Sequence, residues 1–294
     1  MRLQVLILGY GEMGHALEYL LADQHDVRIW SRSSPAILEE EASKAQAILY
    51  CLPVNAHLET SLRILPSLNA ECLCLSIAKG LDESGMTASQ VFASVLADKH
   101  RYGVIYGPMI SEEIRLGRYS FADVSLSKKE DFRVIHKLFQ GTPLICREVE
   151  DMAGISWSVI LKNVYAIIFG VADELNLGDN MRGHLMVSAL TELSDIVKLL
   201  GGRADTPFSY AGLGDLLTTA TSENSHHHAL GRKLASGLYS DISGEGVHTL
   251  KMVEKYQLFE SQRYSLFTLV SDIVNQPDTL KNRIELYLKQ IKSW

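Results

Sequence analysis

The sequence predicts an α/β protein with an amino-terminal Rossmann-type doubly wound sheet, residues 1–149, followed by an all-α domain, residues 150–294. Three observations indicate this fold class. Short apolar runs alternate with helix-like segments through the first half of the chain. A glycine motif follows the first apolar run and opens the first helix-like segment. Strand-like runs stop near residues 147–151, where Arg-Glu-Val-Glu-Asp interrupts the apolar pattern.

Six apolar runs of the first half are typical of strands: residues 3–8, 27–30, 47–52, 72–77, 104–106 and 124–126. Helix-like segments lie between several of them, at residues 12–22, 56–68 and 87–97. Continuous apolar runs belong to strands that are buried on both faces, as in parallel sheets covered by helices. We therefore expect a parallel sheet with helices on both of its faces.

The second half of the chain reads as helices alone. Residues 155–175 are apolar around much of a helical circumference, which predicts a buried helix. A second helix over residues 186–200 meets Gly201 and Gly202, which suit a helix C-terminus. Further helices are expected at residues 229–238, 250–256, 266–274 and 280–291.

Composition narrows the class of protein. A length of 294 residues suggests two domains, at roughly 150 residues each. A net charge of −7 argues against a nucleic-acid-binding protein. The four cysteines form no CxxC pair, which argues against a zinc ribbon and fits a reducing cytoplasm. No uninterrupted apolar run approaches the ~18 residues that span a bilayer, and no signal peptide is recognisable. We expect a cytoplasmic protein without membrane insertion.

Gly9, Gly11 and Gly14 form a GxGxxG motif between the first strand and the first helix. In this context the first glycine permits a tight turn, the second allows a pyrophosphate to approach the backbone, and the third allows close packing. Glu12 and Met13 lie in the helix's first turn, whose N–H groups and dipole favour phosphate. We predict that residues 9–14 bind a dinucleotide.

The end of the second strand indicates which dinucleotide. An NAD site usually has an acidic residue there for the ribose 2′-hydroxyl, whereas this chain continues with Ser31 and Arg32. Arg32 could bind a 2′-phosphate through paired, charge-assisted hydrogen bonds. The sequence thus favours NADP over NAD, although Arg32 could equally be a solvated surface residue.

Four further segments, taken in order, resemble the NAD(P)-dependent glycerol-3-phosphate dehydrogenase family. They are residues 76–81 (Ser-Ile-Ala-Lys-Gly-Leu), Gly107 with Pro108, residues 161–164 (Leu-Lys-Asn-Val) and residues 212–216 (Gly-Leu-Gly-Asp-Leu). Gly178, Asn180 and the Gly-Glu-Gly of residues 244–246 extend the match, so the resemblance covers nearly the whole chain. It implies interconversion of sn-glycerol 3-phosphate and dihydroxyacetone phosphate by a homodimer.

The resemblance also implies the roles of individual residues. Lys162 is similar to the family's catalytic lysine, a general acid/base, and Lys79, Asp215 and Asn163 complete the catalytic set. Cofactor contacts are implied for Lys79, Ser111 and Glu245, and substrate contacts for Lys79, Gly107, Met109, Lys162, Asp215, Ser225, His226 and His227.

Three of these residues also have readings from the sequence alone. Lys162 interrupts a very apolar helix, so its ammonium either snorkels to the edge or points into a cleft. Burial beside a cation such as Lys79 would favour the neutral amine that a base requires. Lys79 could instead be a solvated loop lysine. Asp215 could equally cap a helix, and this role is compatible with the catalytic one.

Two departures from the family pattern concern substrate binding. Where the family has serine, arginine, asparagine and a basic residue, this chain has Ser225 and three histidines, residues 226–228. Histidine is largely neutral at pH 7, and losing a charged hydrogen bond costs about 1.5–3 kcal/mol. Met109 stands where the family has a small hydroxyl residue, and Ser111 stands where alanine is usual.

These departures leave two alternatives open. One is a related reductase of another small hydroxy or keto compound, and the other is a cofactor-binding protein without turnover. Adjacent histidines diverge by ~100° around a helix, so we expect no metal at residues 226–228. The expected partners are a small-molecule substrate and a second copy of the chain.

Overall fold

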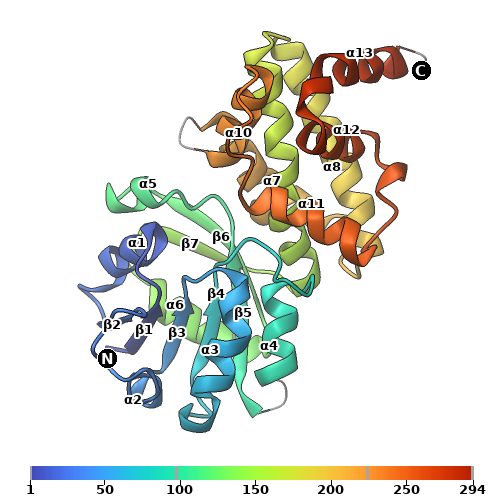
Figure 1. The fold of residues 1–294 in the computed structure, drawn as a ribbon. Helices are drawn as coiled ribbons and strands as arrows, with labels where there is room; N and C mark the ends of the chain where they lie inside the picture. The colour runs from blue at the N-terminus through green and yellow to red at the C-terminus, as the bar shows by residue number, and fades with distance from the viewer. Residues whose placement is uncertain (1, 97–98, 223–224, 293–294) are drawn as a thin grey trace. The chain divides into compact units, whose positions relative to one another are not determined.

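The computed structural model describes residues 2–96, 99–222 and 225–292 (Figure 1). The chain divides into two compact units, Met1–Ser156 and Trp157–Trp294. The first unit contains a seven-stranded sheet with helices, and every regular element described in the second unit is helical. The predicted fold class is therefore confirmed.

The sheet has the strand order β2-β1-β3-β4-β5-β6-β7. Its strands are β1 (Gln4–Leu8), β2 (Asp26–Trp30), β3 (Ala47–Tyr50), β4 (Leu73–Ser76), β5 (Arg101–Tyr106), β6 (Ser120–Leu126) and β7 (Leu144–Glu148). All six predicted strands are present. Neighbouring strands run parallel except for β5 and β6, so the expectation of a wholly parallel sheet is wrong at that pair. The short connection between them reverses the chain around a five-residue helix, α5 (Ser111–Arg115).

Helices cover the sheet on both faces. They are α1 (Glu12–Leu21), α2 (Leu38–Lys44), α3 (His57–Ile64), α4 (Ala88–Leu96), α5 and α6 (Phe132–Phe139). The predicted helix at 56–68 is shorter, because 3₁₀ turns occupy Val54–Ala56 and the proline-containing Leu65–Ser67. The predicted helix at 87–97 begins at Ala88, and its last predicted residue, Ala97, lies outside the described residues.

Alternation along β1 shows how the sheet separates two cores. Val5 and Ile7 belong to one buried cluster, whereas Leu6 and Leu8 belong to the other. Side chains of a strand point alternately to opposite faces, so each face of the sheet has its own core. This arrangement leaves the strand ends as the places where loops can bind ligands.

The second unit continues with α7 (Met152–Glu174), whose first residues belong to unit 1, and then α8 (Asp179–Leu199), α9 (Asp215–Thr221), α10 (His226–Ala235), α11 (Glu245–Tyr256), α12 (Ser265–Asn275) and α13 (Leu280–Ile291). Several of these helices begin earlier than predicted, because their first turns are polar and lack the apolar residues on which the prediction depended. Gly201 has a φ of 89°, and the Gly202 N–H donates to the Val197 carbonyl at 2.9 Å. The predicted C-terminal cap of α8 is thus confirmed.

Helix α7 is long and apolar enough to cross a membrane by length and composition, although no unbroken apolar run suggested it. Its apolar window is wholly buried inside the protein, so α7 is a core helix. Two glycines let α10 approach it closely. A Cβ at Gly170 would lie 2.0 Å from the His228 carbonyl oxygen, and one at Gly231 would lie 2.0 Å from the Ile167 carbonyl oxygen.

Candidate functional site

The three glycines of the loop after β1 meet different constraints. Gly9 has a φ of 99°, and a Cβ there would lie 2.7 Å from the Cys51 carbonyl oxygen. A Cβ on Gly14 would lie 2.2 Å from the Gly9 carbonyl oxygen. A Cβ on Gly11 would meet nothing within 4 Å. Gly9 and Gly14 therefore shape the loop, and the backbone at Gly11 is open to a pyrophosphate.

The start of α1 suits a phosphate group. Among the described residues no side chain caps this helix, so its first-turn N–H groups keep their hydrogen-bonding capacity. The Glu12 carboxylate is turned aside and pairs with Arg115 at 2.7 Å, while Met13 packs against the core. The residues present therefore fit a dinucleotide at this loop.

The segment after β2 presents an exposed cation. Arg32 is exposed and has no ion pair among the residues that the structure describes. The Ser31 hydroxyl lies 3.1 Å from the Ser33 hydroxyl. A guanidinium in this position is accessible to a 2′-phosphate, and equally to water.

Lys79 and Gly107 come together at the carboxyl ends of β4 and β5. The Lys79 Nζ donates to the Gly107 carbonyl at 2.9 Å, and Lys79 is half-buried. Only glycine fits at position 107, because a Cβ would lie 2.3 Å from the Phe121 carbonyl oxygen. Ser111 is buried, and its hydroxyl donates to Glu112 at 3.0 Å.

Met109 packs into one of the two cores of unit 1. Its side chain is 6% exposed and lies in the same core cluster as Ile105 and Ile114. The substrate contact expected of Met109 stays a prediction.

A buried hydrogen-bond chain, not anticipated from the sequence, holds the loop that carries Lys79. The Pro53 carbonyl can only accept, so His57 Nδ1 donates to it at 3.1 Å and Nε2 accepts from the Ser76 hydroxyl at 2.8 Å. Ser76 Oγ also accepts from the Ala78 N–H at 3.1 Å. Burial lowers the pKa of His57 to about 4, so the ring is neutral at pH 7. The one indication of this chain in the sequence was Ser76, a polar residue at the end of the otherwise apolar β4.

In the second unit, Lys162 of α7 is buried beside a carboxylate. Its Nζ lies 3.1 Å from Asp215 Oδ2 and donates to Thr219 Oγ1 at 2.6 Å. Lys162 is 4% exposed and Asp215 is 3% exposed. Asp215 is the first residue of α9 and follows Gly214 at the cap position, so the helix-cap interpretation of Asp215 is wrong.

A carboxylate beside a buried amine favours the ammonium form and opposes the effect of burial. Thr219 fixes the position of the Lys162 ammonium, because its hydroxyl also donates to the Asp215 carbonyl at 2.6 Å. The Lys162 Nζ is therefore held in one position by two neighbours from α9. Asn163 is buried too, and its carbonyl oxygen would lie 2.7 Å from a Cβ on Gly246, so α7 closely approaches the start of α11.

The histidine segment divides into three environments. Ser225 caps α10 by accepting from the His228 N–H at 3.2 Å, and His226 is exposed. His227 Nε2 accepts from the Gly246 N–H at 3.2 Å, in the first turn of α11. His228 is buried with Nε2 2.7 Å from Asp173. The hydrogen bonds of Ser225, His227 and His228 are therefore structural, and His226 presents an exposed ring.

Glu245 begins α11, directly after Gly244, which has a φ of 118°. Burial raises the pKa of the Glu245 carboxyl, and nearby His248 opposes this effect. Within residues 2–96, 99–222 and 225–292, no group of three or more histidine, cysteine, aspartate and glutamate side chains is placed to hold a metal ion.

A glycine loop that leads from a parallel strand into a helix, followed by a helical unit with a buried lysine, defines a class of Rossmann-type oxidoreductases. Two family models match this chain, the NAD-dependent glycerol-3-phosphate dehydrogenase N-terminus over residues 36–131 and the C-terminus over residues 151–285. The chain belongs to the NAD-dependent glycerol-3-phosphate dehydrogenase family.

Individual relatives agree. Glycerol-3-phosphate dehydrogenase (NAD(P)+) of Gloeobacter violaceus is 31% identical over 280 residues, covering 92% of this chain and 90% of that protein. The Acaryochloris marina protein of the same name is 32% identical over 260 residues, covering 85% and 83%. A crystal structure of glycerol-3-phosphate dehydrogenase from Coxiella burnetii has the same fold, with a TM-score of 0.83, 24% identity, and coverage of 98% and 99%.

Proposed function

We propose that this protein interconverts sn-glycerol 3-phosphate and dihydroxyacetone phosphate as an NAD(P)-dependent oxidoreductase. The observation that carries the proposal is Lys162, a buried ammonium positioned by Asp215 and Thr219 in the part of the chain that matches the family's C-terminal model. The names of the relatives give the substrate.

Residues 9–14 hold the cofactor pyrophosphate in this proposal, with the open backbone at Gly11 and the N–H groups of α1 as donors. When bound, NAD(P) supplies or accepts the hydride. Exposed Arg32 favours NADP, because a guanidinium pairs well with a 2′-phosphate. Lys79, half-buried at the sheet's carboxyl edge, binds a substrate or cofactor oxygen.

Lys162 is the general acid in the reducing direction and donates its proton to the oxygen of the carbonyl being reduced. In the oxidising direction the neutral amine takes the hydroxyl proton. Asp215 stabilises the ammonium, and Thr219 directs it through a fixed hydrogen bond. Asn163 follows Lys162 on the same buried helix and completes the polar set.

His226 is the proposed ligand of the substrate phosphate within the histidine segment, because it is the one whose ring is exposed. An exposed imidazole can donate a hydrogen bond to a phosphate oxygen. Removing the ring is therefore expected to raise the KM for dihydroxyacetone phosphate.

The test is oxidation of NADPH and of NADH with dihydroxyacetone phosphate. Turnover with either cofactor supports the function, and a raised KM for this substrate in His226→Ala supports His226 as the phosphate ligand. Cofactor binding without turnover on this substrate would overturn the proposal. In that case a cofactor-binding protein without turnover is the remaining interpretation if other carbonyl compounds also fail.

One observation favours a second candidate, a reductase of another small keto compound. His226 replaces the family's arginine, which weakens the case for a phosphorylated substrate. The fold permits this alternative, because a ketopantoate reductase family structure from Ralstonia eutropha shares it with a TM-score of 0.57 and 15% identity. Preference for an unphosphorylated carbonyl compound in the same assay would establish it.

We further propose a cytoplasmic homodimer. The four cysteines are free, which suits a reducing compartment. The resemblance to the family implies the dimer, and α8 exposes two apolar side chains, Val187 and Leu199, which are 67% and 56% accessible. Light scattering of the purified protein gives the oligomeric state directly, and a mass of one chain would contradict the dimer.

A further inference from the structure

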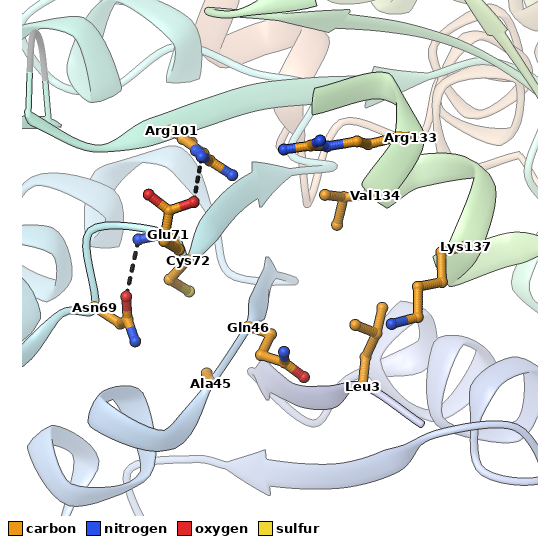
Figure 2. A pocket seen from close by; sticks show the side chains of 10 residues that line it. All are labelled: Leu3, Ala45, Gln46, Asn69, Glu71, Cys72, Arg101, Arg133, Val134 and Lys137. Carbon is orange, nitrogen blue, oxygen red and sulfur yellow. Dashed lines mark hydrogen bonds and ion pairs between the residues drawn. The ribbon is translucent and has the colours of Figure 1, made fainter. Parts of the chain in front are cut away.

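Unit 1 contains a cavity of about 450 Å³ at the amino ends of its strands (Figure 2). Leu3, Gln46 and Cys72 immediately precede β1, β3 and β4, and Arg101 begins β5. The glycine loop follows the carboxyl end of β1 instead. The cavity therefore lies at the opposite edge of the sheet from the proposed cofactor site, and none of the proposed roles involves it.

Basic side chains from two elements face this cavity. Arg133 and Lys137 are four residues apart on α6 and thus share one helix face. Figure 2 shows the Arg133 side chain extending toward Arg101. Arg101 is already neutralised by Glu71 and by buried Asp131, at 3.2 Å from the latter. Arg133 and Lys137 have no ion pair among the described residues, and these three cations with Glu71 and Asp131 carry a net charge of +1 in a chain whose net charge is −7.

The amides of the wall add donors. The Gln46 Oε1 accepts from the Gln4 N–H at 3.1 Å, and the Asn69 Oδ1 accepts from the Glu71 N–H at 2.9 Å. These bonds fix both amides, so the groups that remain for a ligand are their NH₂ ends. The one carboxylate of the lining, Glu71, is engaged by Arg101. The groups of the cavity wall that can still bind a ligand are thus mainly hydrogen-bond donors and cations.

The rest of the lining is apolar, with Leu3, Ala45, Cys72 and Val134. We infer that this cavity binds a small organic anion, whose carboxylate or phosphate group accepts from Arg133 and Lys137 and whose short hydrocarbon part lies against the apolar wall. The volume is within the roughly 300–1,000 Å³ of small-molecule sites. The inference is independent of the proposed function.

The experiment is calorimetric titration of the whole chain, saturated with NADPH, using succinate in one arm and inorganic phosphate in the other. The variant is Arg133→Gln with Lys137→Gln. The matched control is Lys281→Gln with Lys289→Gln, which removes the same charge from exposed positions on α13. We expect the first pair to weaken the binding of at least one probe tenfold or more, and the control to change it less than twofold.

The arm with the tighter binding identifies the anion as a carboxylate or a phosphate. The inference is overturned if neither probe binds at millimolar concentration, or if both variant pairs bind like the original protein. Thermal melting of each variant checks that it is folded. The readout is binding, so it remains informative even if the protein fails to turn over dihydroxyacetone phosphate.

Discussion

The regions around Lys79 and Lys162 position a lysine in opposite ways. The loop that carries Lys79 is held by neutral groups, because the Ala78 N–H donates to Ser76 Oγ and the Ser76 hydroxyl donates to His57. Lys162 is held by an ion, the buried carboxylate of Asp215. A neutral hydrogen bond contributes about 0.5–1.5 kcal/mol, whereas breaking a buried ion pair costs about 3–5 kcal/mol. The second region is therefore far less tolerant of substitution than the first.

The largest effect is expected at Lys162. Lys162→Ala removes the proposed proton donor, so kcat should fall by roughly 10²–10⁴ while the Kd for NADPH changes little. Steady-state kinetics and cofactor titration measure the two quantities. Near-normal turnover in this variant would end the assignment of Lys162 as the acid/base group.

The free energy of unfolding separates the contribution of the Lys162–Asp215 ion pair to stability from the role of Lys162 in turnover. Lys162→Met and Asp215→Leu each leave one buried charge, so each should lower the free energy of unfolding by about 3–5 kcal/mol. The double variant should recover most of this loss and still lack activity. Urea unfolding of the four proteins completes the cycle, and additive losses would contradict the coupling seen in the structure.

In the region around Lys79, the free energy of unfolding should depend on pH through His57. The pKa of His57 is lowered to about 4 in the folded protein from 6.5, so the unfolded chain binds the extra proton first. The stability contributed by neutral His57 is therefore complete above pH 6.5 and declines as the pH falls toward 4, by about 3 kcal/mol in total.

Urea unfolding at pH 7, 5.5 and 4.5 measures this decline. His57→Gln keeps a hydrogen-bonding side chain that does not titrate, so the difference in stability between the original protein and this variant isolates the histidine. The same pH slope in both proteins would exclude His57 as its source.

The smallest effect is expected at Arg32, an exposed cation of unit 1. Arg32→Ala should leave folding unchanged, because Arg32 is exposed and has no ion pair among the described residues. If Arg32 binds the 2′-phosphate, NADPH affinity should fall roughly tenfold to a hundredfold while NADH affinity stays the same. Equal losses for both cofactors would refute this role.

The sequence predicted structure well at positions where only one residue type satisfies the local physical constraint. The positive φ of Gly9 and the crowding at Gly14 require glycine, so their spacing predicted the loop. Lys162 was recognisable because a charged side chain is rare within an apolar, buried helix, where its burial is costly. The partner Thr219 was not, since it lies 57 residues from Lys162 and threonine is common on helices.

Other features depend on the assembled fold. The strand β7 was missed because it is partly exposed along its length and its residues, Leu-Ile-Cys-Arg-Glu, do not form a continuous apolar run. The antiparallel pairing of β5 and β6 depends on how the connection between them turns. The packing of Met109 against Ile105 and Ile114 could not be predicted from its place after Gly107, because it depends on the assembled core.

The glycines at 170 and 231 have a consequence for how the protein can evolve. They let α7 and α10 touch backbone to backbone, and α10 begins at His226. Even a single methyl group at Gly170 would collide with the His228 carbonyl and push the first turn of α10 outward. The backbone of residues 226–228 therefore keeps its place only while positions 170 and 231 carry no side chain, so the geometry of the histidine segment depends on two glycines, one on each helix.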